Sequence, residues 1–305
     1  MKHTVTTLLI GIFLLFTSCS EQKKTKTDTP YIVTTTGMIA DLVENIAGQA
    51  FKVEGLMGPG VDPHLYKASQ SDISKLSRAD VIFYNGLQLE GKMTDILKKM
   101  KRKKTVVAIS DGIARDSLIK LEGAKYAFDP HIWFDVHLWK QTIPTVVKHL
   151  RAEFPEYTNQ FTQNAEQMTQ KLDTLHHWVK QQVQTVPEQQ RIMITAHDAF
   201  EYFGVAYGIK VYGLQGISTV AEYGVHDVNR MVDLILENKI RAVFVETSVP
   251  KRSIEAVVAG VRARDGDVHI GGTLYSDAMG AAGSGANTYI GMVRSNVTTI
   301  VNALK

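Results

Sequence analysis

The segment PEYTNQFTQNAEQMTQKLDTLHHWVKQQVQ, residues 155–184, is the longest helical pattern in this chain of 305 residues. No strand signal interrupts the sequence between positions 134 and 184, and the pattern is longer than an average globular helix. We therefore predict a helical spine that joins two lobes. Apolar side chains recur along it at steps of three to four residues, as on one face of a helix: Phe161, Ala165, Met168, Leu172, Leu175 and Val179.

On both sides of this spine, short apolar strands alternate with amphipathic helices. This alternation predicts two similar α/β lobes, each with a mostly parallel sheet and flanking helices. We expect an N-terminal lobe over 31–150, a linker helix over 151–187 and a C-terminal lobe over 188–305. The predicted strands are 31–35, 51–57, 80–84, 105–109, 191–195, 209–213, 241–246 and 268–274. The predicted helices outside the linker are 38–47, 70–77, 93–101, 199–203, 226–237, 252–263 and 289–303.

The first thirty residues carry a localisation signal. Lys2 precedes an apolar run over 8–16 that is too short to span a bilayer and is bounded like a signal peptide. Cys19 follows at the position where a bacterial lipoprotein signal is cleaved. Three residues before it, Phe16 replaces the leucine that is usual in such signals. We expect a signal over 1–18, lipidation of Cys19 and a flexible tether over 19–30. An ordinary secretory signal is the alternative.

Composition limits the functions that remain. The chain has 34 Lys and Arg against 31 Asp and Glu, a balance too even to indicate a nucleic-acid partner. The densest basic run, 98–104, contains no aromatic residue and is expected to be a solvated helix end. Cys19 is the only cysteine, so a lipidated chain would have no thiolate ligand and no disulfide. Any metal site must then use nitrogen and oxygen.

Four residues from distant parts of the chain form a candidate metal-ligand set: His64, His131, His197 and Asp277. Three imidazoles and one carboxylate complete the shell of a borderline divalent cation such as zinc. In open α/β sheets, ligands bind beyond the carboxyl ends of the strands, where His64, His197 and Asp277 follow predicted strands. His64 and His131 each end an Asp-Pro-His sequence, whose proline restricts the backbone before the imidazole. Two ligands per half would place the ion between the lobes.

Other motifs point away from common enzyme classes. The glycine-rich run 280–285 lacks the ending of a phosphate loop and the Gly-x-Ser-x-Gly pattern of a serine hydrolase. No His-Glu-x-x-His sequence is present. His176 and His177 are adjacent on the linker helix, point to different faces and are expected to be surface histidines. Four further histidines are expected to be structural: His137, His149, His226 and His269.

Five segments together resemble the solute-binding proteins of zinc and manganese ABC importers, the TroA-like family. The resemblance covers the mature chain and implies two lobes bridged by one long helix, with His64, His131, His197 and Asp277 as the four metal ligands. The segments are Gly60-Val61-Asp62-Pro63-His64, Asn85-Gly86-Leu87-Gln88-Leu89-Glu90, Asp129-Pro130-His131-Ile132-Trp133, Thr195-Ala196-His197-Asp198-Ala199-Phe200 and Leu274-Tyr275-Ser276-Asp277-Ala278-Met279-Gly280.

The resemblance leaves two metals open. Manganese carriers of the family commonly have Glu as the third ligand, whereas this chain has His197, and a third nitrogen favours zinc. Many zinc carriers, however, have a long His-rich loop before the second ligand, and residues 111–128 contain no histidine. We expect one Zn²⁺ as the transported ligand, with Mn²⁺ as the alternative.

The resemblance implies a monomeric carrier rather than an enzyme. It would be held at the outer face of a membrane by the lipid on Cys19 and would deliver its ion to an ABC-transporter permease. An extracytoplasmic metal-dependent hydrolase is one competing class, and Glu201 or Glu246 would be its general base. A metal-binding adhesin of the same fold is another.

Overall fold

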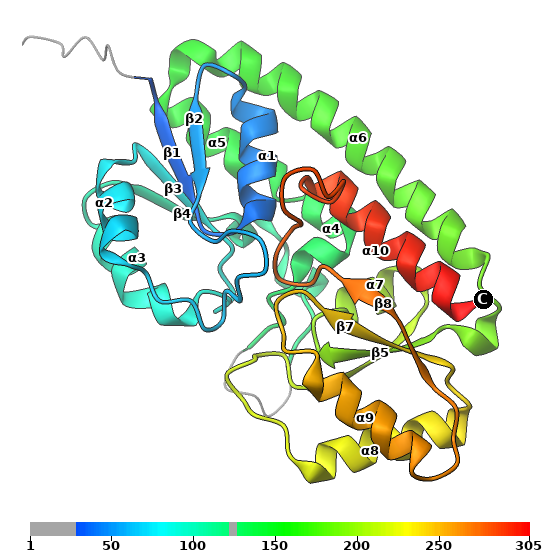
Figure 1. Ribbon diagram of the computed structural model, residues 1–305. Coiled ribbons are helices and arrows are strands. Elements are labelled where there is room, and N and C mark those ends of the chain that lie inside the picture. The colour runs from blue at the N-terminus through cyan, green and yellow to red at the C-terminus, as the bar shows by residue number, and fades with distance from the viewer. Residues whose placement is uncertain (1–28, 122–126) are drawn as a thin grey trace, which may run out of the picture.

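The structure, a computed structural model, describes residues 29–121 and 127–305. Two α/β lobes lie on either side of a junction, and one long helix runs beside both of them (Figure 1). The fold class is therefore the predicted one. Cys19, the signal and most of the tether fall outside the described residues. Within the described residues, no helix is both long and apolar enough to cross a membrane.

The N-terminal lobe contains a four-stranded parallel sheet in the order β2-β1-β3-β4. One sheet face, with Ile32 and Phe83, packs against helices α1 and α5, and the other, with Val33 and Ile82, packs against α2 and α3. Because both faces are covered, β1, β3 and β4 are almost uninterrupted apolar runs, whereas the edge strand β2 is partly exposed and contains Lys52 and Glu54. The strands are β1 (Tyr31–Thr34), β2 (Lys52–Gly55), β3 (Val81–Tyr84) and β4 (Thr105–Ala108). The helices are α1 (Gly37–Ala47), α2 (Gln70–Arg78), α3 (Thr94–Lys101), α4 (Val136–Lys140) and α5 (Ile143–Glu153).

The C-terminal lobe repeats this arrangement with two parallel strand pairs, β5-β6 and β7-β8. Strands β5 and β7 lie side by side, so the pairs form one layer between two sets of helices. Ile194 and Val243 face helices α8 and α9, whereas Met193 and Phe244 face the side of α7 and α10. The strands are β5 (Ile192–His197), β6 (Lys210–Gln215), β7 (Ala242–Glu246) and β8 (His269–Leu274). The helices are α7 (Glu201–Tyr207), α8 (Val225–Asn238), α9 (Arg252–Arg262) and α10 (Tyr289–Leu304).

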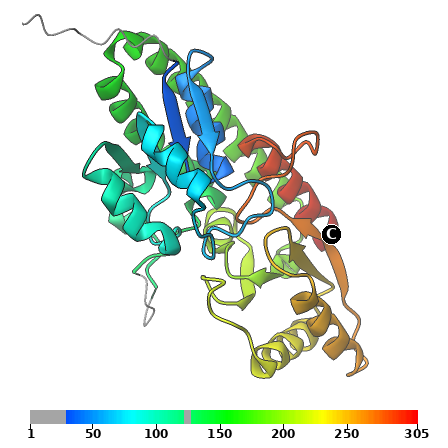
Figure 2. The same cartoon turned by 60° about the vertical axis from the view of Figure 1, so that its left-hand side comes forward.

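Helix α6 (Thr158–Gln184) is the predicted spine. It has 27 residues and, at 1.5 Å per residue, is about 40 Å long, which suffices to reach both lobes. It packs against α1 and α5 of the first lobe and against α7 and α10 of the second, and both views show it alongside the two lobes (Figure 2). Its buried face consists of Phe161, Met168, Leu172, Leu175, Val179 and Val183.

Two local expectations need correction. The helix predicted at 199–203 begins later, at Glu201, because β5 continues to His197 and the chain then turns. Phe200 at the start of this helix packs on Phe134, with ring centroids 4.1 Å apart. His176 is not a simple surface histidine: its Nδ1 lies 3.1 Å from the hydroxyl of Tyr207.

Candidate metal centre

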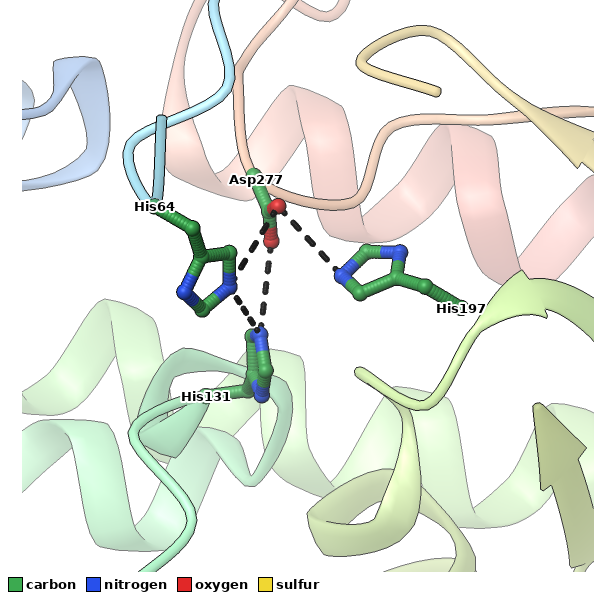
Figure 3. Close-up of side chains that lie close together, drawn as sticks. All are labelled: His64, His131, His197 and Asp277. Atoms are coloured by element: carbon green, nitrogen blue, oxygen red, sulfur yellow. Dashed lines mark hydrogen bonds and ion pairs between the residues drawn. The ribbon is translucent and has the colours of Figure 1, made fainter. Parts of the chain in front are cut away.

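The four predicted ligand residues meet between the lobes. Each contributes one donor atom, and these four atoms lie within 4.8 Å of one another. The side chains point toward a common centre, with His64 and His131 coming from the first lobe and His197 and Asp277 from the second (Figure 3). All four are buried, His64 the least so at 4% exposure. An ion can therefore reach this centre only if the lobes or their loops move.

The spacing of the donor atoms suits a small cation. Nε2 of His64 lies 3.3 Å from Nε2 of His131, and Nε2 of His197 lies 3.3 Å from Oδ2 of Asp277. Two further pairs, His131 with Asp277 Oδ1 and His64 with Asp277 Oδ2, are 3.5 and 3.9 Å apart. Zinc bonds of 2.0–2.1 Å in a tetrahedron separate the donors by about 3.3 Å. The observed distances thus need only small adjustments to hold one ion.

Several of these atoms have no hydrogen-bond partner. Among the described residues, Nε2 of His197 and both carboxylate oxygens of Asp277 are buried without a hydrogen-bond partner, and the contacts of Asp277 with the imidazoles are 3.3 Å or longer. Burying a polar group without a partner is costly, and a buried carboxylate especially so. A bound cation would satisfy all three atoms at once.

Both Asp-Pro-His sequences form the same local turn. Oδ1 of Asp62 accepts the backbone N–H of His64 at 2.8 Å, and Oδ1 of Asp129 accepts that of His131 at 2.9 Å. The aspartate two residues earlier thus fixes the peptide that carries each imidazole, as in other Asx turns.

Carboxylates orient two of the three imidazoles. Nδ1 of His131 lies 2.7 Å from Oδ1 of Asp129, and Nδ1 of His197 lies 2.5 Å from Oε2 of Glu246. Glu246 also accepts the backbone N–H of His197 at 2.8 Å through Oε1. A proton on Nδ1 of each ring leaves Nε2 free as a ligand, which is the usual arrangement behind metal-binding histidines.

Asp277 is positioned by hydrogen bonds of the two residues that precede it. The carbonyl of the preceding Ser276 accepts the indole N–H of Trp133 at 3.0 Å, across the lobe junction. The amide side chain of Asn296 on α10 pairs with the backbone N–H and carbonyl of Tyr275, at 2.9 and 2.7 Å. The carboxylate is therefore held by the core of the protein rather than by a free loop.

Burial and neighbouring charges shift the pKa values of the site in different directions. Burial lowers the pKa of His64 to about 3, so its ring stays neutral. Burial also opposes a charge on His197, but Glu246 and Asp277 outweigh it and raise the pKa of His197 above its usual value. Burial would raise the pKa of Asp277, yet the imidazoles, His197 foremost, hold it well below its usual range. The site thus has an ionised carboxylate ready for a cation.

Glu246 is a partner of His197 that the sequence did not assign. The sequence offers it as the general base of a competing hydrolase, but both its oxygens bind His197 within one lobe. The sequence carries a signal for this contact, because Glu246 ends the predicted strand 241–246, His197 follows the predicted strand 191–195, and neighbouring parallel strands end at one edge. Asp198, next to His197, lies before the first turn of α7, and burial next to Asp129 and Glu201 raises its pKa to about 6.

Known proteins share this fold over almost the whole chain. The family described as zinc-uptake complex component A, periplasmic (ZnuA) matches residues 32–303. The manganese-binding lipoprotein MntA of Bacillus subtilis (strain 168) is 48% identical over 274 residues, 90% of this chain and 89% of that protein. The zinc-binding protein TroA of Treponema pallidum (strain Nichols) is 45% identical over 298 residues, 97% of this chain and 96% of that protein. A solved structure of periplasmic zinc-binding protein TroA from Treponema pallidum has a TM-score of 0.88 at 46% identity, covering 91% of this chain and 99% of that chain.

Proposed function

Because the chain belongs to the zinc-uptake complex component A family, we propose that it captures one divalent transition-metal ion and delivers it to an ABC-transporter permease. The single observation that carries the proposal is the convergence of three Nε2 atoms and one carboxylate in a buried space between two lobes. His64, His131, His197 and Asp277 are the proposed ligands. Release would follow when contact with the permease separates the lobes.

Zinc is the proposed cargo and manganese the alternative. Three nitrogens and one carboxylate oxygen suit zinc, which is satisfied by four ligands, whereas manganese prefers more oxygen and a higher coordination number. The names of the two relatives support either metal, since one is called manganese-binding and the other zinc-binding. Asp129 and Glu246, the carboxylates that contact Nδ1 of His131 and His197, would orient these ligands for zinc and manganese alike.

The proposed location is the outer face of a membrane, through a lipid on Cys19. The name of the Bacillus subtilis relative, a lipoprotein, supports this assignment, as does the signal-like sequence over 1–18. We further propose a flexible tether over 19–30, a monomer, and the lobe boundaries 31–150, 151–187 and 188–305. Helix α6 supports the middle segment of that division.

We propose binding and transport rather than catalysis. Four protein ligands leave no open coordination position for a reactive water. Both oxygens of Glu246, one of the candidate general bases, are engaged by His197. Hydrolysis of generic ester or phosphate substrates by the metal-loaded protein would contradict this part of the proposal.

Elemental analysis with competitive titration tests the proposal on the chain from Ser20 to Lys305, which retains every described residue. We expect one equivalent of zinc in the parent and a loss or sharp weakening in His197→Ala. His177→Ala is the matched control, because His177 is exposed on α6, and it should bind as the parent does. Preference for manganese would keep the carrier function and change its cargo. A protein that binds neither ion would overturn the proposal.

A further inference from the structure

The four strands of the N-terminal lobe all begin at one edge of their sheet, because they are parallel. Hydrogen bonds link the start of β1 to the connection before β3, and that connection to the one before β4. Asp80, just before β3, accepts the backbone N–H of Tyr31 at 2.9 Å and donates its own N–H to the Tyr31 carbonyl at 2.8 Å. Lys104, just before β4, donates through Nζ to the carbonyls of Ser77 and Ala79, each at 2.6 Å. The basic run at the end of α3 therefore lies at the same edge of the sheet as the start of β1, with the connection before β3 between them.

Cations from three separate connections gather at this edge. We call them the basic edge: Lys52, Arg78, Lys101, Arg102, Lys103 and Lys104. All except Lys104 are exposed. Lys101, Arg102 and Lys103 form no ion pair with any other described residue. These three cations are therefore available to a partner outside the protein.

The acidic groups beside the basic edge are already engaged. Asp80 binds Tyr31, as described, and Glu153 at the end of α5 accepts the hydroxyl of Thr105. Glu54 on β2 pairs with Lys75 at 2.7 Å and with Lys52 at 3.5 Å. The edge therefore presents an excess of positive charge, although the whole chain is nearly balanced.

The length of the segment between Cys19 and β1 limits how far the basic edge can lie from the membrane. The described residues begin at Thr29, and the 11 residues from Ser20 to Pro30 can extend over at most about 40 Å. A lipid on Cys19 would keep the basic edge within that distance of the membrane surface. Such a tether makes even a weak interaction with the membrane effective, because the anchored protein stays at a high local concentration beside the lipid surface.

We propose that the basic edge binds the anionic phospholipid headgroups of the membrane in which the Cys19 lipid is embedded. The proposal rests on the proposed lipidation for its biological setting, but the basic edge itself attracts anionic lipid without an acyl chain. Clustered lysine and arginine near an anionic bilayer bind through long-range attraction that salt screens.

This contact would also orient the carrier. Strand β1 begins at the outer end of the lobe and runs toward the junction with the second lobe (Figure 1). The metal ligands lie at that junction, beyond the carboxyl ends of strands such as β2 and β5, opposite the basic edge. If the basic edge binds the bilayer, the metal centre faces away from the membrane. In this orientation the protein can capture ions from the surrounding medium.

Vesicle co-sedimentation of the unlipidated chain from Ser20 to Lys305 tests the proposal. We expect binding to vesicles with about one-third phosphatidylglycerol and none to pure phosphatidylcholine, with release at about 0.5 M salt. Each basic residue near an anionic surface contributes about fivefold to partitioning, so Lys101→Gln, Arg102→Gln and Lys103→Gln together should reduce it on the order of 100-fold. Lys104 is left unchanged because it binds the end of α2.

A triple variant with Lys180→Gln, Lys210→Gln and Lys251→Gln is the matched control. These lysines are exposed on other elements, so this variant loses the same charge and should still bind. Equal loss in both variants, binding to uncharged vesicles, or binding only to a soluble polyanion such as heparin would overturn the proposal. Zinc titration of the same samples separates the two proposals, because the basic-edge variant should keep parental zinc affinity whether or not it binds vesicles.

Discussion

The hydroxyl of Thr219 donates a 2.6 Å hydrogen bond to Oδ2 of Asp62, joining the loop that carries His64 to a loop of the C-terminal lobe. The other oxygen of Asp62 holds the backbone of His64. One carboxylate thus connects the position of a metal ligand to the contact between the lobes. A cavity of ≈670 Å³ lies beside this pair, lined in part by Leu65 and Tyr223.

Removal of this interlobe hydrogen bond should speed metal release. Thr219→Val keeps the shape of the side chain but removes the hydroxyl, and a hydrogen bond to a charged group that is partly screened by solvent contributes about 1 kcal/mol. We therefore expect zinc to transfer about fivefold faster to a chelator in stopped-flow measurements. Thr219→Ser restores the hydroxyl and should release at the parental rate. Equal rates in parent and Thr219→Val would show that the contact does not hold the lobes together.

The carboxylates behind the imidazoles should strengthen metal binding without touching the ion. In Glu246→Gln, an amide can accept only one of the two N–H groups of His197 that the carboxylate accepts. Loss of such an orienting partner weakens metal affinity about 10- to 100-fold. Competitive titration should reveal this drop in Glu246→Gln and in Asp129→Asn, while the exposed Glu222→Gln stays at the parental value. An unchanged affinity in both site variants would contradict the role assigned to these carboxylates.

Metal binding should release a proton near pH 7. Although burial opposes its charged form, Glu246 and Asp277 raise the pKa of His197, so metal-free protein holds a proton that the ion must displace. Burial keeps His64 neutral, with its pKa lowered to about 3, and the lowered pKa of Asp277 keeps it ionised, so neither adds a proton. Apparent affinity should then rise with pH until the pKa of His197 is passed.

Calorimetry in two buffers of different ionisation enthalpy measures this release. We expect about one proton per ion in the parent and fewer in Glu246→Gln, where the charge that raises the pKa of His197 is gone. A binding enthalpy that does not depend on the buffer would refute proton displacement.

Asp41 should make the metal-free protein less stable at neutral pH. Burial, with a smaller contribution from Glu44, raises the pKa of Asp41 to about 6, although the N–H of Tyr289 acts against this. The folded state therefore binds the Asp41 proton more tightly than the unfolded state does. The stability that this proton contributes is complete below about pH 4 and is lost as the pH rises through about 6.

Asp41→Asn should consequently be more stable than the parent at pH 7, by about 2 kcal/mol, and nearly equal to it at pH 4. Chemical denaturation in the presence of a chelator measures both values. Asp95→Asn, on the exposed side of α3, should show no such difference. A destabilised Asp41→Asn at both pH values would mean that the contact with α10 requires the carboxylate.

Local signals were sufficient to predict the architecture and the four converging side chains. The apolar periodicity over 155–184 predicted the spine because α6 buries one continuous face against both lobes. The Asp-Pro-His sequences predicted rigid turns because proline and the Asx hydrogen bond act within three residues. His197 and Asp277 were found because strand ends converge at one edge of a sheet wherever the strands are parallel.

Contacts between segments far apart in the chain were decided only by the tertiary structure. Whether Glu246 binds His197 depends on β5 and β7 lying side by side, and no local pattern specifies that neighbour. Thr219 meets Asp62 across 157 positions of sequence only because the two lobes pack at one particular distance. The sequence by itself determined which donor atoms are present and near which strand ends they lie, because those depend on local periodicity and turns. The tertiary structure decided which carboxylate orients which imidazole, because that depends on the packing of whole elements against one another.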